Sequence, residues 1–333
     1  PNTDQLADYH TTLRGNRGLP AALKEVLERI PAGAHPMDVM RTGCSMLGNL
    51  EPEGDFDNQQ HIADRLLGVL PSIINYWYRF SHEGVRIETE TDAPNIAGHF
   101  LQTLLGEAPS ELHQRVMDVS LILYAEHEFN ASTFTARVCA STLSDMHSCI
   151  TGAIGSLRGP LHGGANEAAM ELIEKFDSPQ AAIEGVTGML ERKDKIMGFG
   201  HAIYRTSDPR NVIIKGWAEK LAEEVGDTRL YPVSCAIEKL LWDEKELFAN
   251  ADFFHASTFN VRTYADFASQ IEHIPTNLLA SRLKTLTKQG FLEKVPYQTN
   301  PMRYEYVPTD LAKALKPLLR EVRKFGEAYF TDA

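Results

Sequence analysis

The apolar spacing of an α-helix constrains this chain more than any other feature, because it recurs from about residue 20 to residue 250. The residues Leu112, Val116, Val119 and Leu123 form the stripe of a helix packed on a core. No convincing strand pattern precedes residue 261, so we expect a mainly α fold. Helices are expected after Pro20 and over 37–48, 58–80 (bent at Pro71), 131–150 and 164–250, the last broken only at 177–179 and 226–227, with an exposed acidic loop over 82–95.

Residues 262–333 have a different character. A helix over 277–289 is expected, with Leu279, Leu283 and Leu286 as its buried stripe. Two strands follow, over 291–295 and 303–307, around a turn at 297–301, and a last helix runs from Leu311 to Tyr329. With a short helix near 261–267, this is the order of a winged helix-turn-helix, that is, α with one β-hairpin.

Charge separates the same two parts. The whole chain of 333 residues carries a net charge of −12, whereas residues 262–333 hold 11 basic and 8 acidic side chains. The acidic body is therefore a poor nucleic-acid binder, and the basic end is a better one. No apolar run approaches the ~18 residues that a membrane span needs. The 4 cysteines lack metal-ligand spacing, which predicts reduced thiols, a cytoplasmic location and no metal site.

The segment 156–167 reads as a tight turn flanked by glycines, with His162 at its tip. Gly163 and Gly164 are able to take positive φ and to leave room for a ligand or another backbone. Asn166 is placed to cap the next helix. A histidine here can donate a hydrogen bond to a reacting oxygen, and the alternative is a histidine in a surface turn.

Three further stretches favour the first interpretation. Together with 156–167, the stretches 126–132, 197–210 and 251–254 resemble the signature set of the citrate synthase family. The sequence at 144–147 and 152–155 is most similar to the family's bacterial 2-methylcitrate synthase branch. The resemblance covers residues 1–261. It implies a large helical domain over 1–163, a small one over 164–261, a homodimer, and roles in propionate catabolism or the tricarboxylic acid cycle.

The resemblance also implies a reaction and its residues. Propionyl-CoA or acetyl-CoA condenses with oxaloacetate, the coenzyme A thioester being a substrate, without a permanently bound cofactor. Asp252 matches the base that removes the α-proton, His162 the donor to the thioester oxygen, and His201 the acid on the ketone. His127, Arg210 and Asn166 match substrate-binding positions. The coenzyme A contacts match Arg205, Ile196, Met197, Gly198, Phe199 and Gly200.

Each of these residues alone has a plainer interpretation. A single histidine is often a core residue with satisfied hydrogen bonds, Asp252 alone is an ordinary loop carboxylate, and Arg210 alone is a surface ion pair. The four stretches occur together and in the order of the family, and this favours an active site over the plainer interpretations.

The end of the chain resembles another family, the HxlR regulators, through 274–279, Arg282-Leu283 and 303–306. The resemblance implies DNA contacts by Asn277, Ser281, Lys284, Lys288 and Arg303. The alternative is a helical cap with solvated lysines. Both resemblances are partial and meet near Val261-Arg262, as in a natural or artificial chimera. The synthase family's later arginines for oxaloacetate have no counterpart here. A DNA-binding regulator with an incomplete synthase body, or an inert dimerising fragment, is therefore the alternative function.

Overall fold

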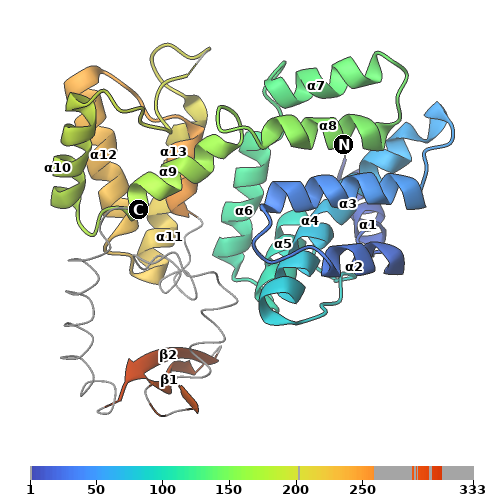
Figure 1. The fold of residues 1–333 in the computed structure, drawn as a ribbon, viewed down its shortest axis with the longest axis horizontal. Coiled ribbons are helices and arrows are strands. Elements are labelled where there is room, and N and C mark those ends of the chain that lie inside the picture. The colour runs from blue at the N-terminus through green and yellow to red at the C-terminus, as the bar shows by residue number, and fades with distance from the viewer. Residues whose placement is uncertain are drawn as a thin grey trace, which may run out of the picture. The chain divides into compact units, whose positions relative to one another are not determined.

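A computed structural model describes residues 2–201, 203–258, 287–288, 290, 292–299 and 302–309. The chain divides into two compact units, Pro1–Asp266 and Phe267–Ala333. The described part contains thirteen α-helices, one 3₁₀ helix and one two-stranded sheet, so the predicted mainly α class is confirmed (Figure 1). None of the helices in these ranges is long and apolar enough to cross a membrane.

The first core is built from the N-terminal helices. They are α1 (Thr3–Gly15), α2 (Ala21–Glu28), α3 (Pro36–Leu50), α4 (Gln59–Glu83) and α5 (Ile96–Leu105), with the 3₁₀ turn η1 (Phe56–Asn58) before α4. Leu23, Leu27 and Ile73 are fully buried where α2, α3 and α4 meet. Pro71 lies inside the 25-residue α4, which continues through it. The apolar stripes read from the sequence therefore face one common core.

The acidic segment between α4 and α5 is the largely exposed loop that its composition predicts, but it is anchored at two buried residues, Thr89 and Ala93. Arg17, only 2% exposed, donates hydrogen bonds to the backbone carbonyls of Thr91, Ala93 and Asn95. Thr89 is buried as well, and its hydroxyl accepts from the Leu19 amide. A buried guanidinium needs such acceptors, so it pins this segment to the end of α1.

The predicted single helix over 131–150 is two helices. After α6 (Glu111–Tyr124) come α7 (Ala131–Ala140) and α8 (Met146–Leu157), which lie side by side (Figure 1). Leu143 takes φ of 62° between them, and the Asp145 side chain accepts from the Ser148 amide as the N-cap of α8. A capping aspartate stabilises the start of a new helix. The chain therefore turns at 141–145, although the small residues that suggested one helix continue on both sides of the turn.

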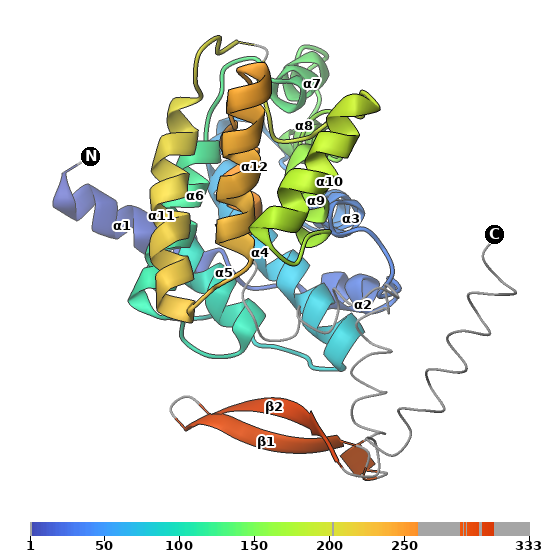
Figure 2. The ribbon, with the colours of Figure 1, turned by 90° about the vertical axis from the view of Figure 1, so that its left-hand side faces the viewer.

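The second core lies between the later helices. It is formed by α9 (Gly164–Glu174), α10 (Pro179–Glu191), α11 (Pro209–Val225) and α12 (Leu230–Lys245), which Figure 2 shows, together with α13 (Ala251–Thr258), which is labelled in Figure 1. The predicted breaks fall between α9 and α10 and between α11 and α12. A longer non-helical segment between α10 and α11 was not expected. Gly198 and Gly200 have φ of 87° and 71° there, which a helix excludes, and this segment carries His201.

The second unit is described through its hairpin. Strands β1 (Leu292–Thr299) and β2 (Met302–Pro308) pair antiparallel, so the strands are longer and the turn shorter than the sequence predicts. The register shifts between Pro296 and Gln298. A proline cannot donate to the ladder and is tolerated at such an irregularity, which lets the strand continue past it. The predicted helix from Leu311 and nearly all of 277–289 lie outside the described residues.

Candidate active site

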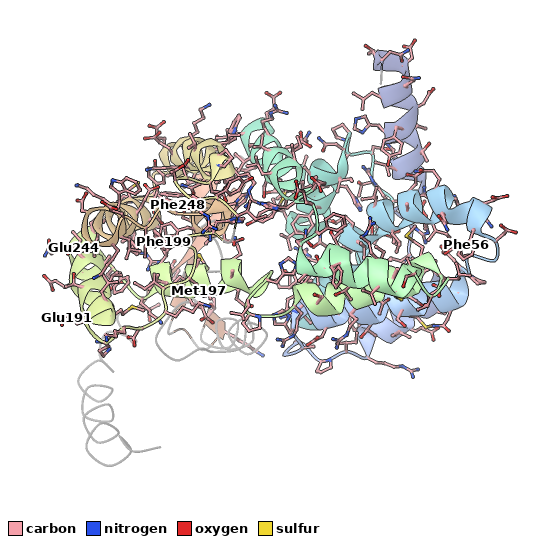
Figure 3. All side chains as sticks on the ribbon, turned by 90° about the horizontal axis from the view of Figure 1, so that it is seen from above. Phe56, Glu191, Met197, Phe199, Glu244 and Phe248 are labelled. Carbon is pink, nitrogen blue, oxygen red and sulfur yellow. The ribbon has the colours of Figure 1, made fainter. Side chains whose placement is uncertain are left out.

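A short backbone pairing holds residues 198–200 against residues 248–250. The Gly200 amide donates to the Phe248 carbonyl and the Asn250 amide to the Gly198 carbonyl, each at 2.9 Å. A Cβ at Gly198 would lie 3.0 Å from the Phe253 side chain, so the close approach requires glycine. Figure 3 shows Met197, Phe199 and Phe248 gathered at this place. The pairing joins the segment before His201 to the start of α13, which carries Asp252.

A buried ion pair ties α11 to the same point. Arg210 donates from Nε and Nη2 to the two carboxylate oxygens of Asp208, at 3.0 and 2.8 Å. Asp208, whose side chain is fully buried, also accepts from the Ala251 amide at 3.0 Å. Burial alone would raise the pKa of Asp208, but the hydrogen bonds from Arg210 and Ala251 outweigh it and hold this pKa below its ordinary value. The first turns of α11 and α13 are thus locked together.

Asp252 is held by its backbone and by its side chain. Its carbonyl accepts from Asn166 Nδ2 at 3.0 Å, and its amide donates to Asn250 Oδ1 at 3.0 Å. Its Oδ1 accepts a 2.6 Å hydrogen bond from the Tyr124 hydroxyl at the end of α6. Burial raises the pKa of Asp252, against the lowering effects of Tyr124 and Arg210. A carboxylate with a raised pKa is a stronger base than a surface aspartate.

His201 is fixed in one neutral tautomer. Its Nδ1 lies 3.1 and 3.2 Å from the backbone amides of Ile203 and Tyr204, which can only donate. We therefore assign the ring proton to Nε2. Burial lowers the pKa of His201, and Asp208 partly offsets this effect. The His127 ring lies 5.1 Å away, with its buried Nε2 free of any hydrogen-bond partner among the described residues.

His162 is fixed in the opposite tautomer. The Ser132 backbone amide donates to His162 Nε2 at 3.3 Å, and the Ser132 hydroxyl lies 2.9 Å from the same nitrogen. We assign the proton of the neutral ring to Nδ1 for this reason. Burial lowers the pKa of His162, and the nearby Asp252 carboxylate partly offsets the effect. The two histidines thus offer donors from different nitrogens.

The glycines around His162 act by close approach and not by positive φ. Gly163 has a φ of −61° and caps α9, and a Cβ there would lie 2.6 Å from the Leu157 carbonyl oxygen. The expected room for another backbone is therefore present, but the expected left-handed conformation is not. Asn166 does not cap α9 as predicted. It lies inside the helix, and its side chain reaches Asp252 instead.

The structure brings most, but not all, of the predicted residues together. His127, His162, His201, Arg210 and Asp252 form one cluster with Asn166 at its edge. Residues 196–200 adjoin it through the backbone pairing, whereas Arg205 is exposed beyond it. A cavity of about 670 Å³, lined by Glu53, Asp145 and His147 among others, contains none of the predicted site residues.

The predicted DNA contacts are hardly described. Lys288 is exposed, and the backbone of Arg303 pairs with Gln298 in the hairpin. Asn277, Ser281 and Lys284 lie outside the described residues.

Sequence reasoning missed Tyr124, Ser132 and Asp208 as members of the cluster. Asp208 carried a signal, because an aspartate followed by proline is a preferred helix start, and its side chain accepts from the Arg210 amide. Ser132 stood within a recognised stretch but had no signal of its own. Tyr124 ends the apolar stripe of α6, where a tyrosine reads as one more packed residue.

Comparison with known proteins places this geometry in context. Residues 1–265 match the family model described as citrate synthase, C-terminal domain. Residues 253–333 match the model described as HxlR-like helix-turn-helix, so the two matches overlap.

Individual relatives agree with the first match. A 2-methylcitrate synthase of Shewanella oneidensis is 73% identical over 260 residues, covering 78% of this chain and 69% of that one. A citrate synthase of Deinococcus radiodurans is 38% identical over 78% of this chain and 70% of its own. Citrate synthase from Thermoplasma acidophilum, solved with carboxymethyl coenzyme A and oxaloacetate, has a TM-score of 0.71 at 27% identity, covering 84% of this chain and 74% of that one.

Proposed function

This chain belongs to the citrate synthase family, and from that membership we propose that its body condenses an acyl-CoA with oxaloacetate and then hydrolyses the thioester. The observation that carries the proposal is the arrangement around Asp252. Two neutral imidazoles of opposite tautomer accompany a base whose pKa is raised by burial. Enolisation and the condensation that follows need this set, namely a base for the α-proton and donors for the oxyanions that develop on the thioester and then on the ketone.

The residues divide the steps as follows. Asp252 removes the α-proton of the acyl group, and His162 Nδ1–H donates to the thioester oxygen as the enolate forms. The enolate carbon attacks the ketone carbon of oxaloacetate, and the ketone oxygen takes a proton from His201 Nε2. The proton that Asp252 removed is then returned to His201 Nε2 through solvent, so both side chains regain their starting states. Water then cleaves the thioester and releases coenzyme A as the free thiol. Every proton in the bond-forming steps moves between substrate and a named side chain.

We propose propionyl-CoA as the preferred acyl substrate. Support comes from the relative of 73% identity, which is named 2-methylcitrate synthase. The methyl group of 2-methylcitrate requires a three-carbon acyl group if oxaloacetate is the partner. One methylene changes pocket affinity by ~1–3 kcal/mol, so acetyl-CoA should react more slowly but measurably.

The binding roles are proposed on position. Arg210, oriented by Asp208, and His127, with its unpartnered nitrogen, are suited to the carboxylates and ketone of oxaloacetate. Asn166 acts indirectly in this proposal, by holding the Asp252 backbone. Residues 196–200 present backbone groups for the adenine of coenzyme A, and the exposed Arg205 is available to its phosphates.

Thiol release tests the proposal. We expect wild-type protein to release free thiol when oxaloacetate is supplied with propionyl-CoA, faster than with acetyl-CoA, and His162→Ala to abolish the release. Circular dichroism of both proteins checks that they remain helical. Absence of release from folded wild-type protein with either thioester would overturn the proposal.

We propose a homodimer in the cytoplasm as the working form. Helix α7 has no buried residue, and it exposes Phe134 and Val138 at 59% and 52%. An unpartnered apolar face of this kind favours contact with a second copy. The free cysteines of the described residues agree with a reducing compartment. Analytical ultracentrifugation of wild type and Phe134→Asp should show dimer and monomer, respectively.

A second function is proposed for the end of the chain, because residues 253–333 match the HxlR-like model. In this proposal the chain consists of a large domain over 1–163, a small domain over 164–261 and a DNA-binding segment over 262–333. Binding of duplex DNA should weaken steeply with added salt, since phosphate contacts release counterions. A filter-binding titration that retains no DNA at low salt would exclude this function without affecting the first.

A further inference from the structure

Tyr124 stands apart from the residues that the synthase mechanism uses, yet it makes a 2.6 Å hydrogen bond to Asp252 Oδ1. Among the described residues, none donates to the other oxygen, Oδ2. The Asp252 backbone is anchored separately by Asn166 and Asn250. The side-chain torsion of Asp252 therefore has one described anchor, and that anchor is the phenol.

We propose that Tyr124 is the positioning residue of the general base: it holds Oδ1 of Asp252 so that Oδ2 is presented to the α-proton of the acyl group. The inference rests on the proposed function. It assigns to the last residue of α6 the orientation of a carboxylate that lies on α13, so that one hydrogen bond joins two elements remote in the sequence.

Tyr124 is itself held in place. Its ring lies 4.5 Å from the ring of His255, which is 1% exposed and one turn after Asp252 on α13. Burial lowers the pKa of His255 to about 4, so the imidazole is neutral and serves as an uncharged surface for the phenol. The phenol thus contacts α13 twice, through the His255 ring and through the Asp252 carboxylate.

The hydrogen bond also affects the charge of Asp252. A donated hydrogen bond stabilises the carboxylate, so it opposes the effect of burial on the pKa of Asp252. Other groups act on the same carboxylate. These are His162 from the loop before α9, His201 from the segment before α11, and Asp208 and Arg210 at the start of α11, whereas His255 on α13 contacts the Tyr124 ring.

Tyr124→Phe is the direct test, because it removes only the hydroxyl and keeps the ring on His255. Tyr124 is 45% exposed, so the lost oxygen leaves no buried cavity. We expect kcat to fall about tenfold at neutral pH, with KM for both substrates within about twofold, since the base is misoriented but binding is not changed. We also expect the acid limb of the pH profile of kcat to move about one unit to higher pH.

Tyr9→Phe is the matched control. The Tyr9 hydroxyl donates to Asp64 Oδ1 at 2.9 Å, so this variant loses the same kind of hydrogen bond away from the cluster. Its kcat and acid limb should equal those of wild type. A further measurement uses 3-fluorotyrosine in the wild-type chain, where the more acidic phenol is a stronger donor and should move the acid limb to lower pH.

A readout without turnover separates this inference from the proposed function. The carboxyl ¹³C signal of Asp252, identified by its loss in Asp252→Asn, should titrate about one unit higher in Tyr124→Phe than in wild type or Tyr9→Phe. If the wild type releases no thiol but the signal shifts, the function fails and the Tyr124–Asp252 coupling stands. An unshifted signal, or an active Tyr124→Phe with an unchanged pH profile, overturns the inference.

Discussion

Two regions of this molecule contain almost the same set of hydrogen-bonded polar groups and differ in what surrounds them. In the α1–α5 region, Arg65 donates to both oxygens of Glu51 and Tyr9 donates to Asp64. In the α11–α13 region, Arg210 donates to both oxygens of Asp208 and Tyr124 to Asp252. The bonds have the same types and similar lengths. Hydrogen bonding alone therefore does not mark a functional site.

The surroundings separate the two regions. Arg65 also donates to the Asn16 carbonyl, and Oδ1 of Asp64 accepts from Gln60 as well as from Tyr9, so further structural partners hold the first set. In the second region, His162 and His201 lie beside the Asp252 carboxylate, and each keeps one ring N–H without a described acceptor. Unused hydrogen-bonding capacity on two imidazoles beside a carboxylate is what distinguishes the candidate site.

The largest expected difference concerns the two tyrosine-bonded aspartates. Asp252→Asn removes the proposed base and should lower kcat for thiol release by about 1000-fold. Asp64→Asn should leave kcat within about twofold, since Asp64 meets no proposed reacting group. Steady-state assays of both variants, with circular dichroism as the control for folding, check the comparison. Equal losses in the two variants would show that the second region is no more reactive than the first.

The next effect is a loss of stability in acid that both regions should share. Burial lowers the pKa of His99 in α5 and of His255 in α13 to about 4, below the ordinary value of 6.5. Such histidines bind a proton more readily when unfolded, so stability is present above pH 6.5 and is lost as the pH falls toward 4. Urea titrations should show the free energy of unfolding falling by about 4 kcal/mol between pH 7 and 5. A value that stays constant would mean that neither imidazole is buried neutral.

The two arginines should differ in kind. Arg210→Lys keeps the charge but not the two-pronged geometry, so KM for oxaloacetate should rise about tenfold. Arg65→Lys should leave KM unchanged and lower the melting temperature, because its bonds to Glu51 and Asn16 only connect α1, α3 and α4. Kinetics and thermal unfolding of both variants distinguish the outcomes. A raised KM in Arg65→Lys would contradict the assignment of Arg65 to structure and of Arg210 to substrate binding.

The smallest expected effect is that of Tyr9→Phe on stability. The Tyr9 hydroxyl joins α1 to α4 through Asp64, and loss of one such hydrogen bond should lower the free energy of unfolding by about 1 kcal/mol. Chemical denaturation of the variant beside wild type measures this quantity. A change near zero would show that Gln60, the other donor to Asp64, satisfies the carboxylate alone.

The sequence was informative wherever local chemistry decides the structure. Val116 and Val119, which define the stripe of α6, are buried, and the mainly helical class follows from such stripes. The sequence was less informative where contacts between distant segments determine the local structure. The conformation at Gly163 is set by the Leu157 carbonyl, and the side chain of Asn166 by the carbonyl of Asp252. Tyr124 could not be identified because its partner lies 128 residues further along the chain.

The pairing of residues 198–200 with 248–250 fixes the distance between one end of the candidate site and Asp252. The segment that precedes His201 and the helix turn that carries Asp252 are fastened by the same two backbone hydrogen bonds. A molecule bound to the segment before His201 would place its other end at a fixed distance from the Asp252 carboxylate. Lengthening that molecule by one carbon would change which atom meets the base, and not how firmly the other end is held.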